Sequence, residues 1–232
     1  MPSPVTILMP IYDGVTQLDF TGPHQFFSRL PDTKIVVASV GGTPVEADGL
    51  TFSGLVDLAE VEACDVLCVP GGNGCTQAIA DARYMAQVAR LAPASRYVTS
   101  VCSGSLILGA AGLLRGRRAA CHWAFRDMLP LFGAIPDPSR VVRDGTIITG
   151  GGVTAGIDFA LAIIAELAGR AAAEAVQLGL EYAPAPPFGP GPGRPETASP
   201  EILEQVSSRI AASMPPRRAI VERAAAELGL VD

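Results

Sequence analysis

Hydrophobic residues occur along the chain in short continuous runs, separated by longer segments of mixed character. Runs that are rich in β-branched residues and bounded by Gly, Pro or Asp predict buried strands. Strands are expected at 5–9, 34–40, 65–69 and 97–101, and hairpins with an Asp-Gly turn at 44–58 and 141–149. Helical patterns lie between them. This alternation predicts an α/β fold with a mostly parallel sheet and helices on both faces.

The strand expected at 97–101 runs directly into Cys102 and then into an apolar helix expected at 106–114. The residues at the junction are small, which a sharp strand-to-helix turn requires. At a helix N-terminus, unpaired N–H groups and the helix dipole favour thiolate over thiol. Cys102 is therefore the candidate nucleophile, with a buried structural cysteine as the alternative. Cys75, at the start of a helix expected to reach Leu91, is a rival.

Other candidate residues also follow strands. The glycine-rich segment 70–74 is interpreted as an oxyanion-binding corner or, equally, as a plain tight turn, and it lacks the lysine of a P-loop. Gly150-Gly-Gly152 ends the second hairpin, and Asp19 precedes a helix expected to start at Thr21-Gly-Pro23. Asp19 alone would be interpreted as a solvated acid or a cap. Because function lies at the carboxyl ends of parallel strands, these segments are expected to meet Cys102 at one edge of the sheet.

Composition excludes several classes of protein. Of 232 residues, 49% are hydrophobic and 17% charged, which argues against disorder, and the net charge of −6 argues against a nucleic-acid partner. The five cysteines and two histidines lack zinc-site spacing, so no metal is expected. Neither a signal peptide nor a membrane span is recognisable, so a cytoplasmic protein with reduced cysteines and no membrane partner is expected.

The second half of the chain adds a possible pocket and a separate tail. A short strand at 119–123 is expected to lead into a helix at 124–131, so that His122 could pair with a thiolate and Trp123 could wall a pocket, although both could equally be core. A long helix is expected from 155 to about 177. The compact domain is expected to end at 182. Residues 183–232 would form a Pro-rich arm and two helices, broken at Pro215-Pro216, that dock on the body or on a second subunit.

Several motifs together carry a resemblance to a known family. They are Leu18-Asp-Phe-Thr-Gly-Pro, Val69-Pro-Gly-Gly, Val101-Cys-Ser-Gly-Ser-Leu, Ala120-Cys-His-Trp and Thr154-Ala-Gly-Ile-Asp-Phe-Ala-Leu. This set resembles the ThiJ/PfpI superfamily over essentially the whole chain, and within it the members that add water to isonitriles. The resemblance implies a flavodoxin-like fold, similar to class I glutamine amidotransferases, a homodimer, and no metal or organic cofactor. It also implies a hydro-lyase that converts an isonitrile into an N-substituted formamide.

Carried over from this resemblance, Cys102 is the nucleophile and Asp19 is the acid that hydrogen-bonds it. The backbone N–H groups of Gly72 and Ser103 correspond to the oxyanion-type donors. The residue after the cysteine is Ser103 in this chain. The peptidase-like members have His at this position, and hydratases have Thr, so the chain departs from both. The possible pocket residues are Gly150, Gly151, Val153, His122 and Trp123.

The expected reaction is attack of the Cys102 thiolate on the isonitrile carbon while Asp19 supplies a proton, followed by hydrolysis of the thioimidate. Two other functions compete with it. One is a glyoxalase- or deglycase-like activity, or a response to cysteine oxidation, on the same scaffold. The other is a ligand-sensing domain like those in front of AraC-type DNA-binding regions, although the tail is too short for such a region and mixes acids with its arginines.

Overall fold

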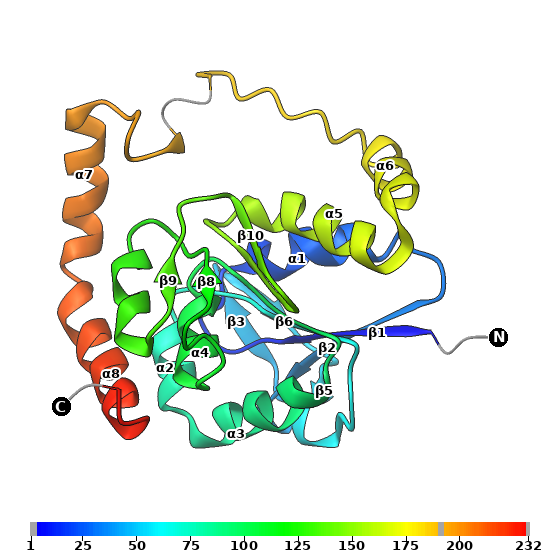
Figure 1. Cartoon of the computed structure of the whole chain (residues 1–232), viewed down its shortest axis with the longest axis horizontal. Coiled ribbons are helices and arrows are strands. Elements are labelled where there is room, and N and C mark those ends of the chain that lie inside the picture. Colours follow the sequence, from blue (N-terminus) through cyan, green and yellow to red (C-terminus); the bar gives the residue numbers. More distant parts are fainter. Residues whose placement is uncertain (1–3, 190–192, 231–232) are drawn as a thin grey trace.

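The computed structural model describes residues 4–189 and 193–230, and they are arranged around one seven-stranded sheet (Figure 1). The strand order is β10-β11-β7-β6-β1-β2-β5, and only β10 runs antiparallel to its neighbour. The strands are β1 (Val5–Pro10), β2 (Thr33–Ser39), β5 (Val56–Asp57), β6 (Val66–Val69), β7 (Tyr97–Val101), β10 (Val141–Asp144) and β11 (Ile147–Gly150). The predicted α/β, flavodoxin-like fold class is confirmed.

Helices cover both faces of this sheet, as Figure 1 shows. On one face lie α1 (Gln17–Phe27), α5 (Ala155–Ala168) and α6 (Arg170–Gly179), and on the other lie α2 (Cys75–Ala80), α3 (Ala82–Leu91) and α4 (Gly104–Ala110). Short 3-10 helices connect them: η1 (Val40–Gly42), η2 (Leu58–Glu60), η3 (Ala92–Ala94) and η4 (Arg126–Phe132). Two small sheets pair β3 (Val45–Ala47) with β4 (Leu50–Phe52) and β8 (Arg118–Ala119) with β9 (Ile135–Pro136).

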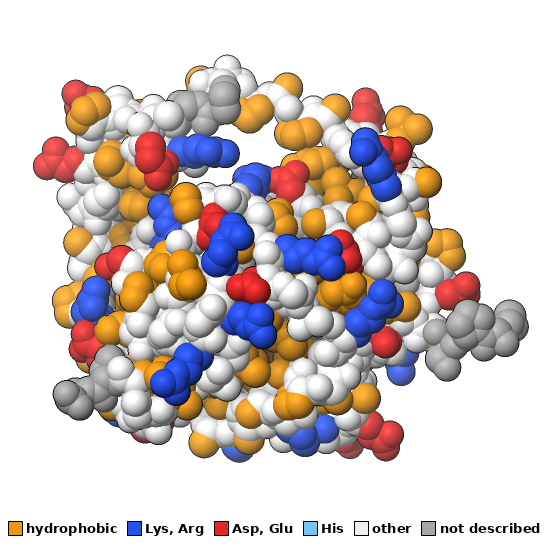
Figure 2. All heavy atoms as spheres, viewed as in Figure 1, with side chains coloured by type: hydrophobic (Ala, Val, Ile, Leu, Met, Phe, Trp, Pro, Cys, Tyr) orange, Lys and Arg blue, Asp and Glu red, His pale blue; other side chains and the backbone are white. Residues whose placement is uncertain are grey.

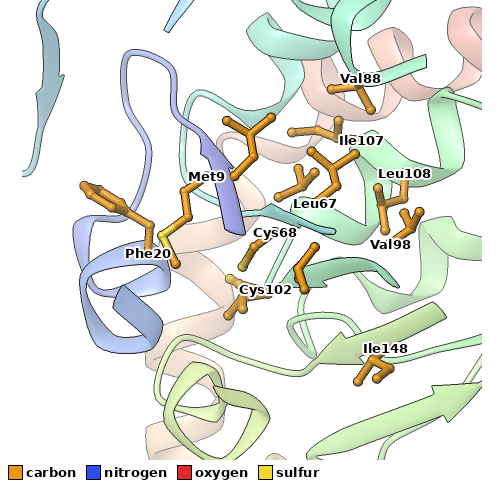
Figure 3. Packing of buried hydrophobic residues seen from close by; sticks show 14 of the residues in the cluster. Met9, Phe20, Leu67, Cys68, Val88, Val98, Cys102, Ile107, Leu108 and Ile148 are labelled. Atoms are coloured by element: carbon orange, nitrogen blue, oxygen red, sulfur yellow. The ribbon is translucent and has the colours of Figure 1, made fainter. Parts of the chain in front are cut away.

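The core lies between the sheet and its helices. Every residue of β6 and β7 is buried, as a central strand covered on both faces requires. Figure 3 shows Cys102 within this core, in the same cluster of buried side chains as Met9, Leu67 and Cys68. The carboxyl end of β7, where Cys102 lies, is thus part of the main hydrophobic core.

Two predicted long helices are each divided in the structure. The helix expected from 75 to 91 breaks at Asp81, whose carboxylate accepts the Arg83 N–H at 2.8 Å and caps α3. The helix expected from 155 to 177 breaks at Gly169, which has φ +87°, a conformation that side chains disfavour. A polar cap and a glycine outweigh the continuous apolar pattern at these two points.

Other predicted boundaries also shift. The first helix begins at Gln17 rather than Thr21, so Asp19 lies in its first turn and Pro23 lies inside it. Residues 124–131 lie largely in a 3-10 helix, η4, which contains Pro130, and 120–123 are not a strand. Pro215 does not separate the last two helices but lies in the first turn of α8, where its missing N–H costs nothing.

The C-terminal part consists of α7 (Pro200–Ala211) and α8 (Met214–Glu227). Helix α8 packs on α2, α4 and η4, and its Val221 and Ala225 are fully buried. Ser199 caps α7 as predicted, through its side chain and the Ile202 N–H, but no α7 residue is buried. Residues 180–189 extend from α6 along the top of the view in Figure 1. Figure 2 shows the same face of the molecule with all atoms drawn.

Candidate functional site

Cys102 occupies a tight elbow between β7 and α4. Its φ is +59°, a left-handed conformation that is unusual for a residue with a side chain. Its N–H donates to the carbonyls of Gly150, at 3.1 Å, and Gly151, at 2.7 Å, so the end of β11 holds the elbow in place. Glycine is required at position 104, because a Cβ there would lie 2.3 Å from the Val69 carbonyl oxygen. The elbow therefore presses directly against the end of β6.

Asp19 enters the same place from α1. Its side chain is fully buried, and Oδ2 accepts the N–H of Gly71 at 2.9 Å. Oδ1 is buried without a hydrogen-bond partner in the described part of the chain. Burial raises the pKa of Asp19 to about 7, although the Gly71 N–H and the Cys102 thiol act in the opposite direction. Near neutral pH this carboxyl group can hold and release a proton.

The Cys102 thiol is itself buried, with 5% exposure. Burial, followed by the charge of Asp19, raises its pKa well above the ordinary value, and the Ser103 N–H only partly offsets this. The prediction of a lowered pKa from the helix terminus is therefore wrong for the resting site. The structure provides a thiol beside a potential base, rather than a free thiolate.

The loop after β6 holds Asp19 and the elbow together. Thr16 donates its N–H to the Gly71 carbonyl at 3.0 Å, and Gly74 donates to the Gly14 carbonyl at 2.9 Å. Gly72 has φ +145°, and a Cβ there would lie 2.4 Å from the Thr16 nitrogen. The segment that begins α1 is therefore paired directly with the glycine-rich corner, which accounts for the glycines of that corner.

The N–H groups of the glycine-rich corner, residues 70–74, differ in detail from the expectation that Gly72 and Ser103 offer a pair of free donors. The N–H of Gly72 is already used, because it donates to the Ser103 hydroxyl oxygen at 3.0 Å. The Ser103 N–H lowers the pKa of the Cys102 thiol, and its role as an oxyanion-type donor stays a prediction. Gly71, which the sequence did not single out, supplies the N–H that binds Asp19. In the sequence, only the position of Gly71 in the Gly71-Gly72 pair could have indicated this role.

Cys75 and Cys121 are less suited to nucleophilic chemistry than Cys102. Cys75 is buried, its thiol donates to the Ser103 carbonyl at 3.2 Å, and burial raises its pKa to about 12. Burial also raises the pKa of Cys121 strongly. Neither has a buried carboxyl group as its hydrogen-bond partner in the described structure. Cys75 instead supports the elbow through its hydrogen bond to the Ser103 carbonyl.

A cavity of about 590 Å³ lies beside the elbow. Four of the five predicted pocket residues line it: Gly151, Val153, His122 and Trp123. Gly150 does not, because it is buried against Phe159. The predicted pairing of His122 with a thiolate is not seen among the described residues. Its Nδ1 accepts the Ala124 N–H at 3.2 Å, and burial lowers its pKa.

A polar network behind the cavity was missed from sequence. The Arg140 carbonyl accepts the Gly151 N–H at 2.9 Å, and the Arg140 guanidinium binds Asp158 and the Thr154 carbonyl. Tyr182 donates its hydroxyl to Asp158 at 2.9 Å. The network thus anchors the loop whose carbonyls accept the Cys102 N–H. The position of Asp158 in the first turn of a helix was the only local feature of the sequence that pointed to this network.

Within residues 4–189 and 193–230, no three His, Cys, Asp or Glu side chains are grouped so as to hold a metal ion. In the same part of the chain, no helix has the length and apolar character needed to cross a membrane.

Comparison with known proteins gives consistent relatives. The chain is 47% identical over 221 residues to an isonitrile hydratase of Pseudomonas putida, covering 95% of this chain and 96% of the relative. A ThiJ/PfpI family protein from Pseudomonas syringae has a crystal structure that superposes with a TM-score of 0.89 at 41% identity, covering 96% of this chain and 90% of that one. Oxidised DJ-1 of Toxoplasma gondii shares the fold, with a TM-score of 0.70 at 24% identity over 78% of this chain and 100% of that one.

The family model of the DJ-1/PfpI family matches residues 5–166. This range contains the glycine corner, the cysteine elbow and the buried aspartate. The chain belongs to the DJ-1/PfpI family.

Proposed function

We propose that this protein is an isonitrile hydratase, a hydro-lyase that adds water to an isonitrile and releases an N-substituted formamide. The observation that carries the proposal is the buried Asp19 carboxyl group, with a pKa of about 7, beside the Cys102 thiol at a strained elbow. The 47% identity to an isonitrile hydratase over nearly the whole chain supports the choice of substrate.

In the first step, the Asp19 carboxylate accepts the thiol proton of Cys102. The sulfur then forms a bond to the terminal carbon of R–N≡C, and Asp19 returns the proton to that same carbon. The product is a thioimidate, R–N=CH–S–Cys102, and Asp19 is again ionised. A carboxyl group with a pKa near the working pH is suited to both halves of this transfer.

In the second step, Asp19 takes a proton from water, and the oxygen of the resulting hydroxide bonds to the thioimidate carbon. Asp19 gives that proton to nitrogen, which yields R–NH–CH(OH)–S–Cys102. The C–S bond then breaks as the hydroxyl proton returns to Asp19. Formamide leaves, and the proton passes from Asp19 to the sulfur, which restores the starting thiol and carboxylate. No metal or organic cofactor is needed.

The neighbouring backbone groups have supporting roles in this proposal. The Ser103 N–H, which acts on the thiol in the resting site, stabilises negative charge on sulfur as it develops. The Gly72 N–H holds the Ser103 hydroxyl, which fixes the turn that carries this donor. The cavity next to Gly151 would receive the R group of the isonitrile.

The competing functions have less support from the same residues. A cysteine that responds to oxidation is commonly an exposed thiolate, whereas Cys102 is buried and its pKa is raised. A helix-turn-helix in the tail is disfavoured because α8 packs on α2, α4 and η4 of its own body.

We further propose that residues 1–182 form the catalytic body and that 183–232 contribute to a homodimer, working in the cytoplasm. The exposed apolar side chains on α6, the arm and α7 support a second copy as the partner: Leu178 at 82%, Phe188 at 86%, Ile202 at 47% and Val206 at 37%. Sedimentation equilibrium should then give twice the chain mass of 23.9 kDa. A monomer at micromolar concentration would contradict the dimer alone.

The function is tested by following N-cyclohexylformamide formation from cyclohexyl isocyanide. Wild type should convert it, Cys102→Ala should not, and Asp19→Asn should lose at least a hundredfold in kcat, which is the usual size of general acid–base catalysis. Cys64→Ala serves as the matched control, because that buried cysteine contacts Ser95 rather than the site. Retained activity in Cys102→Ala would refute the proposed nucleophile.

A further inference from the structure

The cavity beside the elbow has an unexpected charge. Its charged lining residues are Arg126, Arg140, Arg194 and Glu196, and with Asp158 paired to Arg140 the balance is one positive charge in excess. The chain as a whole has a net charge of −6. A cationic pocket in an acidic protein favours an anionic occupant, because a concave site concentrates the field of its charges.

Arg126 is, among the described lining residues, a mostly buried cation whose guanidinium lacks a hydrogen bond. Its side chain is only 23% exposed, yet in the described structure its guanidinium makes no hydrogen bond. Its one ionic partner is Glu196, at 3.7 Å, which is beyond hydrogen-bond distance. A largely buried guanidinium normally has its N–H groups paired, because leaving them unpaired is costly. The planar group therefore remains available for a carboxylate, which it can bind through two parallel N–H groups.

The other two arginines differ from Arg126. The Arg140 guanidinium is ion-paired with Asp158 and donates to the Thr154 carbonyl, so it offers an anion neither an unpaired charge nor a free donor. Arg194 lies on the arm, is exposed, and adds positive charge at the rim of the cavity.

Glu196 marks where an anion would sit. It extends from the arm and is 62% exposed, and its carboxylate is the nearest anion to Arg126. Because its own hydration is largely kept and its distance to Arg126 is long, this ion pair contributes little. A substrate carboxylate that entered the cavity would displace Glu196 from Arg126 and would compete with it for the same cation.

The cavity borders the elbow through its neighbours, and neither Cys102 nor Asp19 lines it directly. Cys121 and Gly151 line it, and the Gly151 carbonyl accepts the Cys102 N–H at 2.7 Å. Arg126 lies close enough to Cys121 to lower the pKa of that thiol against the effect of burial. Arg126 and Cys121 both line the cavity, so the guanidinium and the wall next to the elbow border the same space.

From this arrangement we propose that the substituent of the isonitrile carries a carboxylate or another anionic group, and that Arg126 binds it. The proposal rests on the proposed hydratase function and names its substrate class. A cavity of about 590 Å³ has room for a substituent of several carbons between the isonitrile carbon and the anion.

The test compares ω-isocyanoalkanoates of two, four and six carbons with their methyl esters, which have the same skeleton without the charge. The measured quantity is the ratio of kcat/KM for the acid to that for the ester. In wild type the acid of the best length should be preferred about tenfold, which is the effect of one charge-assisted contact in a partly open site. High salt should reduce this preference.

Two variants should move that ratio in opposite directions. Arg126→Gln should abolish the preference for the acid, whereas Glu196→Gln should increase it, because a competing carboxylate is removed. A merely structural role of either residue would change acid and ester alike. Arg83→Gln, an arginine on α3 with 79% of its side chain exposed, is the matched control and should leave the ratio unchanged.

Equilibrium binding separates this inference from the proposed function. Calorimetry with 4-formamidobutanoate and its methyl ester needs no turnover, and the acid should bind wild type more tightly than the ester. Formamide formation from esters without any preference for acids, in rate or binding, would overturn the anion site and leave the hydratase proposal standing. Acid-selective binding that depends on Arg126, without hydration of any isonitrile, would uphold the anion site and overturn the hydratase.

Discussion

The buried carboxyl group of Asp19 makes a prediction about stability that does not depend on substrate. Burial raises its pKa from 3.8 to about 7, so the folded protein holds the Asp19 proton more tightly than the unfolded chain does. The bound proton raises the free energy of unfolding by its full amount below pH 3.8, and this contribution is lost as the pH rises through about 7. The whole shift corresponds to roughly 4 kcal/mol.

Asp19→Asn removes this dependence while keeping an oxygen for the Gly71 N–H. The variant should therefore gain stability relative to wild type as the pH rises. Of the full effect, roughly 3 kcal/mol should develop between pH 5 and pH 8.5. The upper limit of pH 8.5 keeps Cys102 out of the measurement, because its raised pKa contributes only above its ordinary value of 9.0.

The assay is urea unfolding of both proteins at several pH values, followed by tryptophan fluorescence and circular dichroism. The difference between variant and wild type in free energy of unfolding is plotted against pH, so that any constant cost of the amide cancels. A change below about 1 kcal/mol between pH 5 and pH 8.5 would refute the reasoning, since it would mean that Asp19 is ionised at little cost in the folded protein.

Three further changes test other parts of the structure. Gly71→Ala places a Cβ 2.5 Å from the Ser103 nitrogen, so kcat for formamide formation should fall at least tenfold in a folded protein; wild-type kcat would contradict this. Hydrogen bonds from Ser139 and Arg118 lower the pKa of Asp137 to about 2. The contribution of Asp137 to stability should therefore be lost as the pH falls from 3.8 toward 2, and acid unfolding of Asp137→Asn should lack that loss. Tyr182→Phe should lower the free energy of unfolding by about 1 kcal/mol, measured in urea, and no loss would mean that its hydroxyl bond is not formed in solution.

Much of the fold follows from local patterns. The uninterrupted runs of β6 and β7, each with several β-branched residues, are typical of central parallel strands. The turn between β3 and β4 is formed by Asp48 and Gly49, both with positive φ. The small residues after Cys102 indicate the elbow for the same reason, because few sequences tolerate such a turn. These features depend on neighbours in the chain, which the sequence displays directly.

Two errors are local, and the others arise where distant segments of the chain determine the structure. The break at Asp81 and the break at Gly169 were hidden inside apolar patterns, because periodicity does not record where a single cap or glycine interrupts a helix. The donor to Asp19 is Gly71 rather than Gly72, and this depends on how the segment before α1 pairs with the glycine corner. The network of Arg140, Asp158 and Tyr182 joins residues far apart in sequence.

The ionisation of Cys102 shows most clearly why local chemistry is insufficient. A helix terminus favours thiolate, but burial and the nearby charge of Asp19 oppose it, and these two effects come from the packing of other elements. The result is a thiol next to a carboxyl group that exchanges its proton near neutral pH. In the proposed reaction the isonitrile carbon receives both the sulfur atom and a proton, and this pair can deliver both to one atom. An aldehyde would need its proton at oxygen instead, away from the carbon that sulfur attacks. Under the proposed mechanism, the pairing of Asp19 with Cys102 thus favours the isonitrile over aldehyde substrates of the same scaffold.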